Sequence, residues 1–404
     1  MSDEDRRRSL FARHYEIVPV PERETYSPTA EVFKALLHFG ISEEEARAVL
    51  ECGEKFRPLR CIGPNGSHNL DRKVGPRYCR NVRLCGRDDN IERYGGADDM
   101  LWKMYSLFSA AGIPFTGKVP YFSSRSQALK EYHGPFWWAV DFTESADIWP
   151  RIRFTELSVL GALAYETMKE YFAKVWPMPV KFGMNVYVQA WHSEDPGKGW
   201  YPHVHSIIPR LFYRDDHSLV KSDLVWLNHE KVKLIWRRKV EGRWGKSRGG
   251  FKHRQDMFSV RVQVKLPDEV AVKLRRRGIR HRLRYMGRGF ALDFTKYVNR
   301  GFHYDSWDRE YVAQMLTGNG HKRSQSYGIL SARHLHDGSP FAKHWGLALW
   351  TKRQRQSAAR WRPCPDHPEG HVVLDFESEV EFSRKEAFDA GFLMMKPNFR
   401  AGTS

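Results

Sequence analysis

Two histidines separated by a single residue, His203 and His205, are the first candidates for chemistry in this sequence. They open an apolar segment, residues 203–208, which follows a polar loop containing Gly and Pro; this order predicts a β-strand. Alternation along a strand places both imidazoles on one face, about 7 Å apart, where they could bind one divalent ion. Because the chain contains 18 His, such a pair also arises by chance in a core or on a surface, so a second motif is needed.

A second motif lies downstream, in residues 291–300 (ALDFTKYVNR). If this segment is helical, Asp293 and Tyr297 are four residues apart and share a face, while Lys296 and Arg300 lie on a neighbouring stripe. A phenol beside a carboxylate and two cations is a candidate nucleophile for a metal-bound phosphate, because positive charge favours the phenolate and neutralises the phosphate. The alternative interpretation is a tyrosine packed in the core, with the two cations in solvent.

Together, the apolar segment with His-Val-His and the later D-x-x-K-Y-V-x-R pattern resemble the HUH endonucleases, in particular rolling-circle replication initiators with one catalytic tyrosine. The resemblance implies that His203 and His205 bind the metal and that Tyr297 attacks DNA, which leaves a 5′-phosphotyrosine and a free 3′-OH. It also implies that Asp293, where one plasmid-initiator branch usually has Glu, activates water in a second cleavage.

The same resemblance assigns phosphate binding to Lys296 and Arg300. The family pattern has Lys at the second of these positions, and Arg300 keeps the positive charge. A guanidinium and an ammonium beside the nucleophile would neutralise charge on the DNA backbone.

Two histidines leave a metal ion under-coordinated, so a third side chain must come from the strand that precedes the loop. Gln189, His192 and Glu194 are all within reach, and the alternative for the last two is exposure to solvent in the hairpin loop. Gln189 is the preferred candidate, because related transposases resemble this chain in having a Gln on that strand. Imidazole nitrogens with an amide or carboxylate oxygen and water suit Mg²⁺ or Mn²⁺ when the ion must bind phosphate.

The composition favours a polyanionic partner. The 404 residues include 66 Lys and Arg against 48 Asp and Glu, a formal charge of +18, and 14 Trp interleave with the cations. Aromatic rings stack on unpaired bases while cations bind phosphates, so single-stranded DNA is the expected partner. The resemblance narrows this partner to origin DNA and implies a host helicase and polymerase. A solvated basic surface is the alternative.

The expected location is the cytoplasm. No apolar run has the length of a membrane span, and the N-terminal residues show no signal peptide. Five Cys in so long a chain do not suggest a disulfide scaffold. The resemblance implies a prokaryotic cell and an association with a plasmid or phage.

Four of the five Cys, Cys52, Cys61, Cys79 and Cys85, fall in a short polar segment that could hardly bury a core without a cross-link. Four thiolates around a structural Zn²⁺ would supply one, and His68 could replace one thiolate. The spacings are wider than in common zinc knuckles, so free cysteines are the alternative. Plasmid initiators of the resembled branch often have a Cys-rich module before the nuclease domain, although the CxxC pair expected after Cys85 is missing here.

A further run of metal-ligand residue types, C-x2-H-x3-H, lies at Cys364, His367 and His371. It has one Cys and no second half nearby in the sequence. We therefore expect a loop there.

The order of expected elements indicates an α+β fold. The expected strands are residues 134–143, 181–191, 203–208 and 257–264, and the expected helices of the same domain are residues 155–175 and 222–240. An antiparallel sheet with helices on one face, and with Tyr297 on a covering helix opposite the histidines, agrees with the fold that the resemblance implies.

The chain divides in sequence into four parts. An N-terminal arm with a helical hairpin (1–51) is followed by a Cys-rich zinc module (52–96), an HUH endonuclease domain (116–330) and a C-terminal extension of unknown role (331–404). The hairpin is expected at residues 29–38 and 42–51, and a DNA-reading helix–turn–helix is the alternative. Ser42 with Glu45, and Ser383 with Glu386, form capping-box patterns that predict helix starts.

The leading interpretation is a replication initiator that nicks single-stranded DNA. A transposase with the same chemistry shares the motifs and differs in the DNA ends that it cuts. From another class comes a non-catalytic zinc-containing nucleic-acid-binding protein, in which His203, His205 and Tyr297 are core residues. A cupin or amidohydrolase site would recruit further His or acidic ligands in its own motifs, and the sequence shows none.

Overall fold

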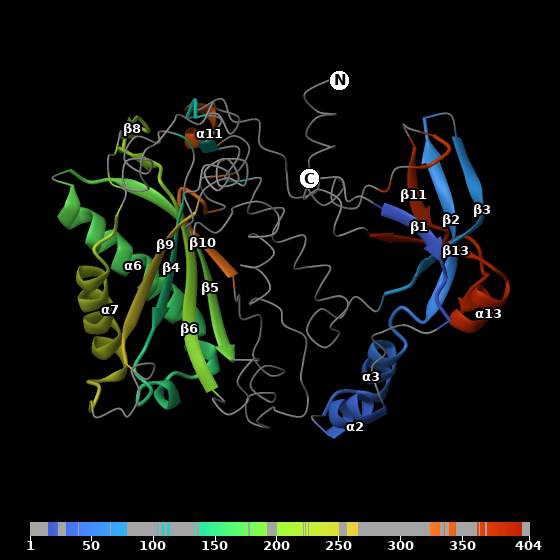
Figure 1. Cartoon of the computed structure of the whole chain (residues 1–404), viewed down its shortest axis with the longest axis horizontal. Coiled ribbons are helices and arrows are strands. Elements are labelled where there is room, and N and C mark those ends of the chain that lie inside the picture. The colour runs from blue at the N-terminus through green and yellow to red at the C-terminus, as the bar shows by residue number, and fades with distance from the viewer. Residues whose placement is uncertain are drawn as a thin grey trace, which may run out of the picture. The chain divides into compact units, whose positions relative to one another are not determined.

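A computed structural model describes two compact units of the chain. The described residues are 15–22, 30–38, 40–64, 66–78, 137–176, 178–191, 200–220, 226–249, 257–265, 324–331, 339–344, 364–367 and 370–397, with a few isolated positions between them. One unit contains both ends of the described chain, and the other contains its middle. Figure 1 shows both units, with most of their helices and strands labelled.

The middle unit is built on an antiparallel sheet of seven strands in the order β8-β7-β5-β6-β4-β9, with β10 added beside β5. Its three central strands are β5 (Lys181–Trp191), β6 (Trp200–Pro209) and β4 (Trp137–Thr143). The others are β7 (Phe212–Tyr213), β8 (Leu219–Val220), β9 (Ser259–Lys265) and β10 (Ser324–Gly328). Because β6 lies between β5 and β4, the strand that contains the histidine pair has a neighbour on each side.

Two long helices, α6 (Leu157–Val175) and α7 (His229–Trp244), cover one face of this sheet (Figure 1). On that face Phe142 of β4 contacts Trp236 of α7, with ring centroids 5.0 Å apart. The helix α6 approaches β5 closely at Gly161, where a β-carbon would lie 3.2 Å from valine side chains of β5. The shorter helical elements of this unit are η1 (Trp149–Arg151), η2 (Phe154–Glu156) and α11 (Pro340–His344).

This architecture agrees with the α+β fold and the antiparallel sheet expected from the sequence. The helix expected at residues 155–175 corresponds to α6, but the helix expected at 222–240 has wrong bounds, since α7 begins at His229 and ends at Trp244. The side chain of Asn228 accepts a hydrogen bond of 3.0 Å from the backbone N–H of Lys231 and so caps α7. The sequence pattern predicted that the helix begins at residue 222, which lies before this cap.

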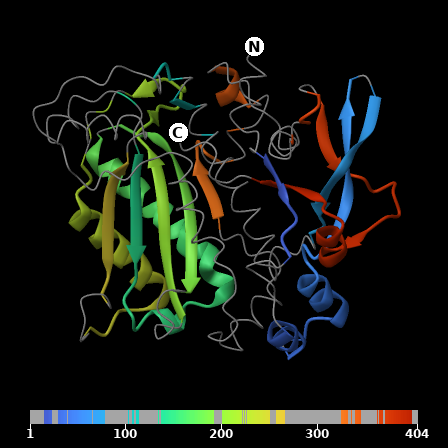
Figure 2. The ribbon, with the colours of Figure 1, turned by 45° about the vertical axis from the view of Figure 1, so that its right-hand side comes forward.

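The second unit contains a six-stranded sheet in the order β1-β13-β3-β2-β11, with β12 also paired to β2 (Figure 2). The hairpin of β2 and β3 supplies its longest strands; β11 is antiparallel to β2 and β13 is parallel to β3. The strands are β1 (Tyr15–Pro19), β2 (Lys55–Gly63), β3 (Gly66–Pro76), β11 (His371–Leu374), β12 (Phe382–Ser383) and β13 (Leu393–Pro397).

The helices of this unit are α2 (Ala30–His38), α3 (Glu43–Leu50) and α13 (Arg384–Asp389). The side chain of Ser42 accepts a hydrogen bond from the backbone N–H of Glu45 at 3.2 Å, and that of Ser383 accepts one from Glu386 at 3.3 Å. Both helix starts predicted from capping patterns are therefore confirmed.

The sheet of the second unit joins segments that the sequence division kept apart. That division separated a Cys-rich module at 52–96 from a C-terminal extension at 331–404, whereas β11 and β12 pair with β2, and β13 pairs with β3. Residues 15–19, expected in the N-terminal arm, form β1 and pair with β13. Composition changes along the chain do not reveal strand pairing between distant segments, which depends on the tertiary fold.

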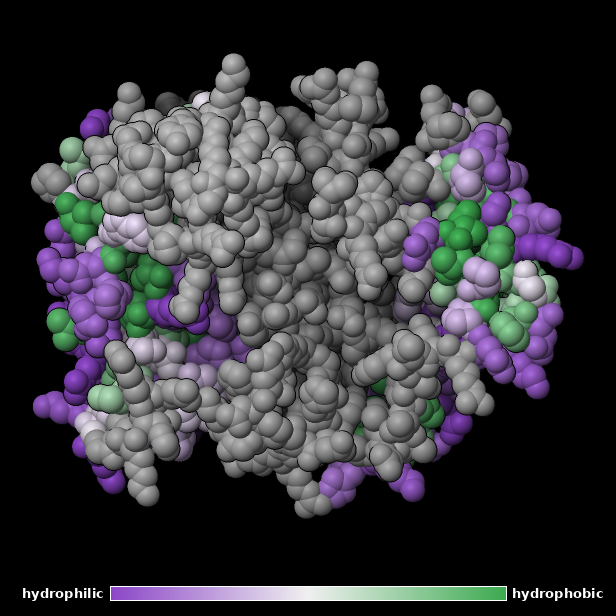
Figure 3. Space-filling model, viewed as in Figure 1, coloured by the Kyte–Doolittle hydropathy of each residue, from purple (hydrophilic) through white to green (hydrophobic). Residues whose placement is uncertain are grey.

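Figure 3 shows described surface on which hydrophilic and hydrophobic residues are interspersed. Several cations of α7 are paired with carboxylates of α6 or of η2, which directly precedes α6. Arg238 forms a hydrogen bond with Glu170, and Arg243 lies 3.0 Å from Glu156. Hydrogen bonds from Lys174 and Arg238 lower the pKa of Glu170 to about 2.

Within the described part of the chain, no helix is both long and apolar enough to cross a membrane.

Candidate functional site

The histidine pair lies on β6, at the centre of the antiparallel sheet. As alternation predicts, His203 and His205 share one face, with ring centroids 4.8 Å apart and an interplanar angle of 76°. The intervening Val204 pairs with Val188, whose side chain would contact a β-carbon at Gly161 of α6. The histidines therefore lie on the sheet face turned away from α6 and α7.

Both imidazoles donate from Nδ1 to an oxygen. The Nδ1 of His203 lies 2.8 Å from the backbone carbonyl oxygen of Tyr201, and the Nδ1 of His205 lies 2.8 Å from Oδ1 of Asp141. A carbonyl and a carboxylate can only accept, so the hydrogen-bond network assigns the proton of each neutral ring to Nδ1. The lone pair is then on Nε2, which is the state in which a histidine binds a metal ion, and the oxygen partner orients the ring.

Gln189 of β5 lies directly opposite His203 in the pairing of β5 with β6. Its Oε1 is 3.3 Å from Nε2 of His205, a contact that is a hydrogen bond when Nε2 carries a proton and that a shared cation would bridge when the proton is on Nδ1. Two ligands of one ion, held by bonds of about 2.1 Å, lie about 3.0–3.4 Å apart, and the observed separation falls in that range. The spacing of Gln189 and His205 thus suits a shared divalent ion, and His203 lies on the same face with its ring centroid 4.8 Å from that of His205.

Sequence reasoning missed one residue of this group, Asp141. It lies on β4, opposite His205 on one side and opposite Arg261 of β9 on the other. Burial would raise the pKa of this carboxyl, but the hydrogen bond with His205 and the electrostatic effects of His205, His203 and Arg261 outweigh burial and hold the pKa below its ordinary value. The available signal was a lone acidic residue at an alternate position of the apolar strand WWAVDFT.

Aromatic rings continue from the histidine pair along the surface of the unit. The ring of Tyr201 lies 4.6 Å from that of His203, and Trp149 contacts Tyr201 edge-on at 4.5 Å. The indole N–H of Trp200 donates to the backbone oxygen of Trp149 at 2.9 Å and fixes the position of η1 beside β6. Tyr201 and Trp149 are both partly exposed, so a base of single-stranded nucleic acid could stack on them.

The second predicted motif lies outside the described residues. Its nucleophile Tyr297, the acidic Asp293 and the cations Lys296 and Arg300 are all among the residues that are not described. The same is true of the two alternative third metal ligands, His192 and Glu194. The described residues therefore include the predicted metal ligands His203, His205 and Gln189 but not the predicted nucleophile.

The predicted cysteine site is only partly reflected in the structure. Cys52 is buried, with 1% of its surface exposed, and it is not a member of the group of described residues that could bind a metal ion. Cys79 and Cys85 lie outside the described residues. Of the four predicted thiolates, Cys61 alone belongs to a described group that could bind a metal ion.

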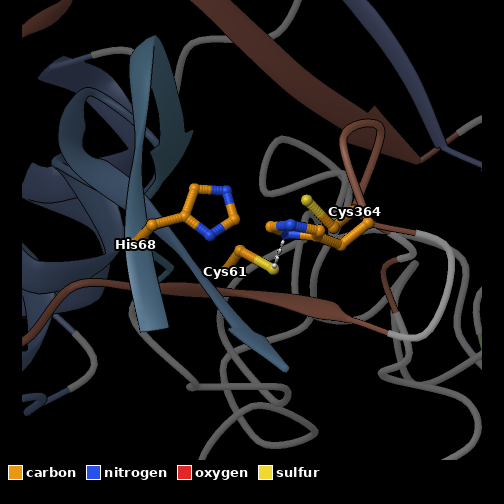
Figure 4. Close-up of side chains that lie close together, drawn as sticks. Cys61, His68 and Cys364 are labelled. Carbon is orange, nitrogen blue, oxygen red and sulfur yellow. Dashed lines mark hydrogen bonds between the residues drawn. The ribbon is translucent and has the colours of Figure 1, made fainter. Parts of the chain in front are cut away.

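That group consists of Cys61, His68, Cys364 and His367, whose ligand atoms all lie within 4.8 Å of one another and could bind a metal such as zinc. In Figure 4 the labelled side chains of Cys61, His68 and Cys364 are turned toward one another. Cys364 and His367 lie in a loop, as expected, whereas His371 begins β11; the fold brings the loop to Cys61, 306 residues before His367, and this proximity was not expected. Burial and a hydrogen bond with Cys364 raise the pKa of the Cys61 thiol to about 11, so a bound metal would have to displace its proton.

Comparison with protein-family models, with curated proteins and with solved structures finds no match. The function must therefore be inferred from the residues of the chain. Two groups of side chains are available for this: the histidine pair with Gln189 and Asp141 in the middle unit, and the Cys and His group in the other unit.

Proposed function

We propose that this chain is an HUH-type endonuclease that nicks single-stranded DNA by tyrosine attack in the presence of Mg²⁺ or Mn²⁺. The observation that supports the proposal best is the arrangement of three polar side chains on the face of the sheet opposite α6 and α7. His203 and His205 both donate from Nδ1, and Oε1 of Gln189 lies 3.3 Å from Nε2 of His205. Two imidazoles and an amide oxygen suit a divalent ion that leaves positions open for phosphate.

Each residue has a defined part in the proposed reaction. His203, His205 and Gln189 would hold the ion, which when bound polarises the scissile phosphate. The phenolic oxygen of Tyr297 attacks phosphorus in line; the bond to the 3′ oxygen breaks, and that oxygen takes up a proton as a free 3′-OH while the 5′ phosphate remains on the tyrosine. Asp293 accepts a proton from water in the second cleavage.

The DNA strand itself would be bound by cations and aromatic rings. Lys296 and Arg300 neutralise phosphates beside Tyr297, and the partly exposed rings of Tyr201 and Trp149 can stack on bases next to the histidines. The free 3′-OH is the primer that a polymerase needs, so the proposed role is a replication initiator acting at the origin of a plasmid or phage. Host helicase and polymerase are then partners, and the prokaryotic cytoplasm is the location.

The test uses the full-length protein with Mn²⁺ and a mixed pool of labelled single-stranded oligonucleotides, separated on denaturing gels. We expect a DNA band shifted by the mass of the protein, which disappears with EDTA. The Tyr297→Phe variant should lose this adduct while it still binds DNA, and the His203→Ala variant should do the same. The matched controls Tyr285→Phe and Tyr304→Phe should keep it.

Two outcomes would redirect the proposal. An undiminished adduct in Tyr297→Phe would move the nucleophile to another tyrosine, and tight DNA binding with no adduct, also on candidate origin DNA, would favour the non-catalytic zinc-containing nucleic-acid-binding protein. The Cys and His group of Cys61, His68, Cys364 and His367 supports that second candidate. An HUH transposase would give the same adduct and would be recognised by the DNA ends that it cuts.

A further inference from the structure

The Cys and His group of the second unit draws its ligands from two distant parts of the chain. Cys61 on β2 and His68 on β3 are direct partners in the hairpin register, so their side chains project from the same face. Cys364 and His367 precede β11, and β11 pairs with β2 so that Val372 lies opposite Cys61. The tertiary fold thus brings one Cys and one His from each part to the same place.

The distances are slightly longer than those around a single tetrahedral ion. The Sγ of Cys61 lies 3.9 Å from Nδ1 of His367, the ring centroids of His68 and His367 are 4.6 Å apart, and all four ligand atoms lie within 4.8 Å of one another. With Zn–S bonds of about 2.3 Å and Zn–N bonds of about 2.0 Å, tetrahedral ligands are separated by about 3.3–3.8 Å. Small side-chain movements would therefore complete the coordination.

Backbone hydrogen bonds hold Cys364, His367 and Gly370 together in a compact loop. The N–H of Cys364 donates to the oxygen of Gly370 at 3.0 Å, and the N–H of Gly370 donates to the oxygen of His367 at 2.9 Å. A β-carbon at Gly370 would lie 2.6 Å from the Sγ of Cys61, so only glycine allows the loop to approach that sulfur.

The surroundings indicate a structural site and not a catalytic one. Both sulfur atoms belong to an apolar cluster of buried residues, Leu59, Cys61, Leu70, Cys364, Val372 and Met395. Four protein ligands occupy all four coordination positions of a tetrahedral ion and leave none for water or substrate, as in closed structural zinc sites. Two thiolates with two imidazoles favour Zn²⁺ over the hard cations that would serve phosphate chemistry.

We propose that Cys61, His68, Cys364 and His367 bind one structural Zn²⁺ that ties the C-terminal part of the chain to the hairpin of β2 and β3. The proposal does not depend on the proposed nuclease function, because the two groups of ligands share no residue. The ion stabilises the sheet at the junction of two segments that the unfolded chain holds far apart.

The first test is the zinc content of the full-length protein, measured by mass spectrometry of the metal after dialysis. We expect about one zinc per chain, and near-complete loss in the Cys61→Ser and His367→Ala variants. Cys52→Ala and His371→Ala are matched controls outside the group and should keep the zinc. The His203→Ala variant should also keep it, which separates this site from the proposed nuclease centre.

A second measurement covers the case in which a ligand variant fails to fold. Exchange of zinc for Co²⁺ in the wild-type chain should give the intense visible bands of a tetrahedral ion and a thiolate charge-transfer band, and removal of the metal should lower Tm. The Gly370→Val variant, which leaves all four ligands in place, should bind zinc several-fold more weakly because its side chain would displace the Cys61 sulfur.

Three results would overturn the proposal. The first is retention of zinc by a Cys61→Ser and Cys364→Ser double variant, which would place the ion elsewhere. The second is a wild-type chain that takes up no zinc when one equivalent is offered after reduction. The third is a disulfide between Cys61 and Cys364, found by thiol counting in the denatured protein, which would make the cross-link covalent instead of metallic.

Discussion

Asp141 and His205 face each other in the antiparallel pairing of β4 with β6, and Oδ1 of the carboxylate lies 2.8 Å from Nδ1 of the imidazole. This contact orients the ring so that Nε2 lies beside Gln189. Removal of such an oxygen partner from a metal-binding histidine typically costs 10- to 100-fold in metal affinity, a range of about 1.4–2.7 kcal/mol. We expect Asp141→Ala to weaken Mn²⁺ binding by about that factor.

The measurement is titration of Mn²⁺ into zinc-loaded protein, with free Mn²⁺ followed by electron paramagnetic resonance. Asp141→Asn keeps an acceptor oxygen and loses the charge, so its effect should be smaller than that of Asp141→Ala. Asp216, whose carboxylate bonds with Ser218 in an exposed turn, supplies the control variant Asp216→Asn, which should not change the affinity. Unchanged binding in Asp141→Ala would mean that Asp141 does not orient a metal ligand.

Binding to single-stranded DNA should weaken steeply with salt. The formal charge of +18 predicts that several phosphates are neutralised, and contact with about six of them gives a slope of about −4 for log Kobs against log salt concentration. Fluorescence anisotropy of a labelled oligonucleotide across a salt series measures it. The Lys296→Gln and Arg300→Gln variants should each flatten the slope by about 0.7. A flat dependence in the wild type would assign the positive charge to another partner.

Glu144 should lower stability at neutral pH. It follows Thr143 at the end of β4, it is fully buried, and within the described part of the chain its carboxyl oxygens have no hydrogen-bond partner apart from the residue's own backbone. Burial raises its pKa well above the ordinary value, so the folded state holds the proton more tightly than the unfolded state does. The contribution of the Glu144 carboxyl to the free energy of unfolding is most favourable below about pH 4.3, the pKa of an unperturbed Glu. This contribution is lost as the pH rises toward the pKa of the folded state.

The Glu144→Gln variant removes this ionisation and nearly keeps the shape of the side chain. We expect it to be more stable than the wild type at pH 7, by about 1–3 kcal/mol in the free energy of unfolding, and to lose most of that advantage near pH 4. Urea unfolding at both pH values tests the difference. A variant less stable than the wild type at both pH values would show that the carboxylate is needed where it lies.

Gly328 should tolerate no side chain. Its φ of +58° favours glycine, and a β-carbon there would lie 1.9 Å from the backbone oxygen of Phe182 on β5. Gly249 has a similar φ of +69° but open space around it, so Gly249→Ala should cost only the backbone strain of about 1–2 kcal/mol. Gly328→Ala should cost at least about 3 kcal/mol, measured by thermal or urea unfolding, because β10 must move away from β5. Equal losses in the two variants would show that backbone strain alone decides the cost.

Local pattern was sufficient for many elements of the middle unit. The apolar alternation of residues 137–143, the periodicity of 157–175 and the strand with His203 and His205 are short-range properties, because the side-chain period of a strand or helix is set by its own backbone. For the same reason the sequence could place both histidines on one face and could identify the helix caps at Ser42 and Ser383.

Partners across the sheet were decided by the tertiary structure. Alternation tells which residues share a face of one strand, but the register of β4 against β6 determines that Asp141 meets His205, 64 residues away. The Cys and His group is the clearest case, since a run with one Cys and two His looked incomplete until the pairing of β11 with β2 brought it to Cys61. Ligands contributed by distant segments leave no spacing in the sequence, because only the folded chain sets the distance between them.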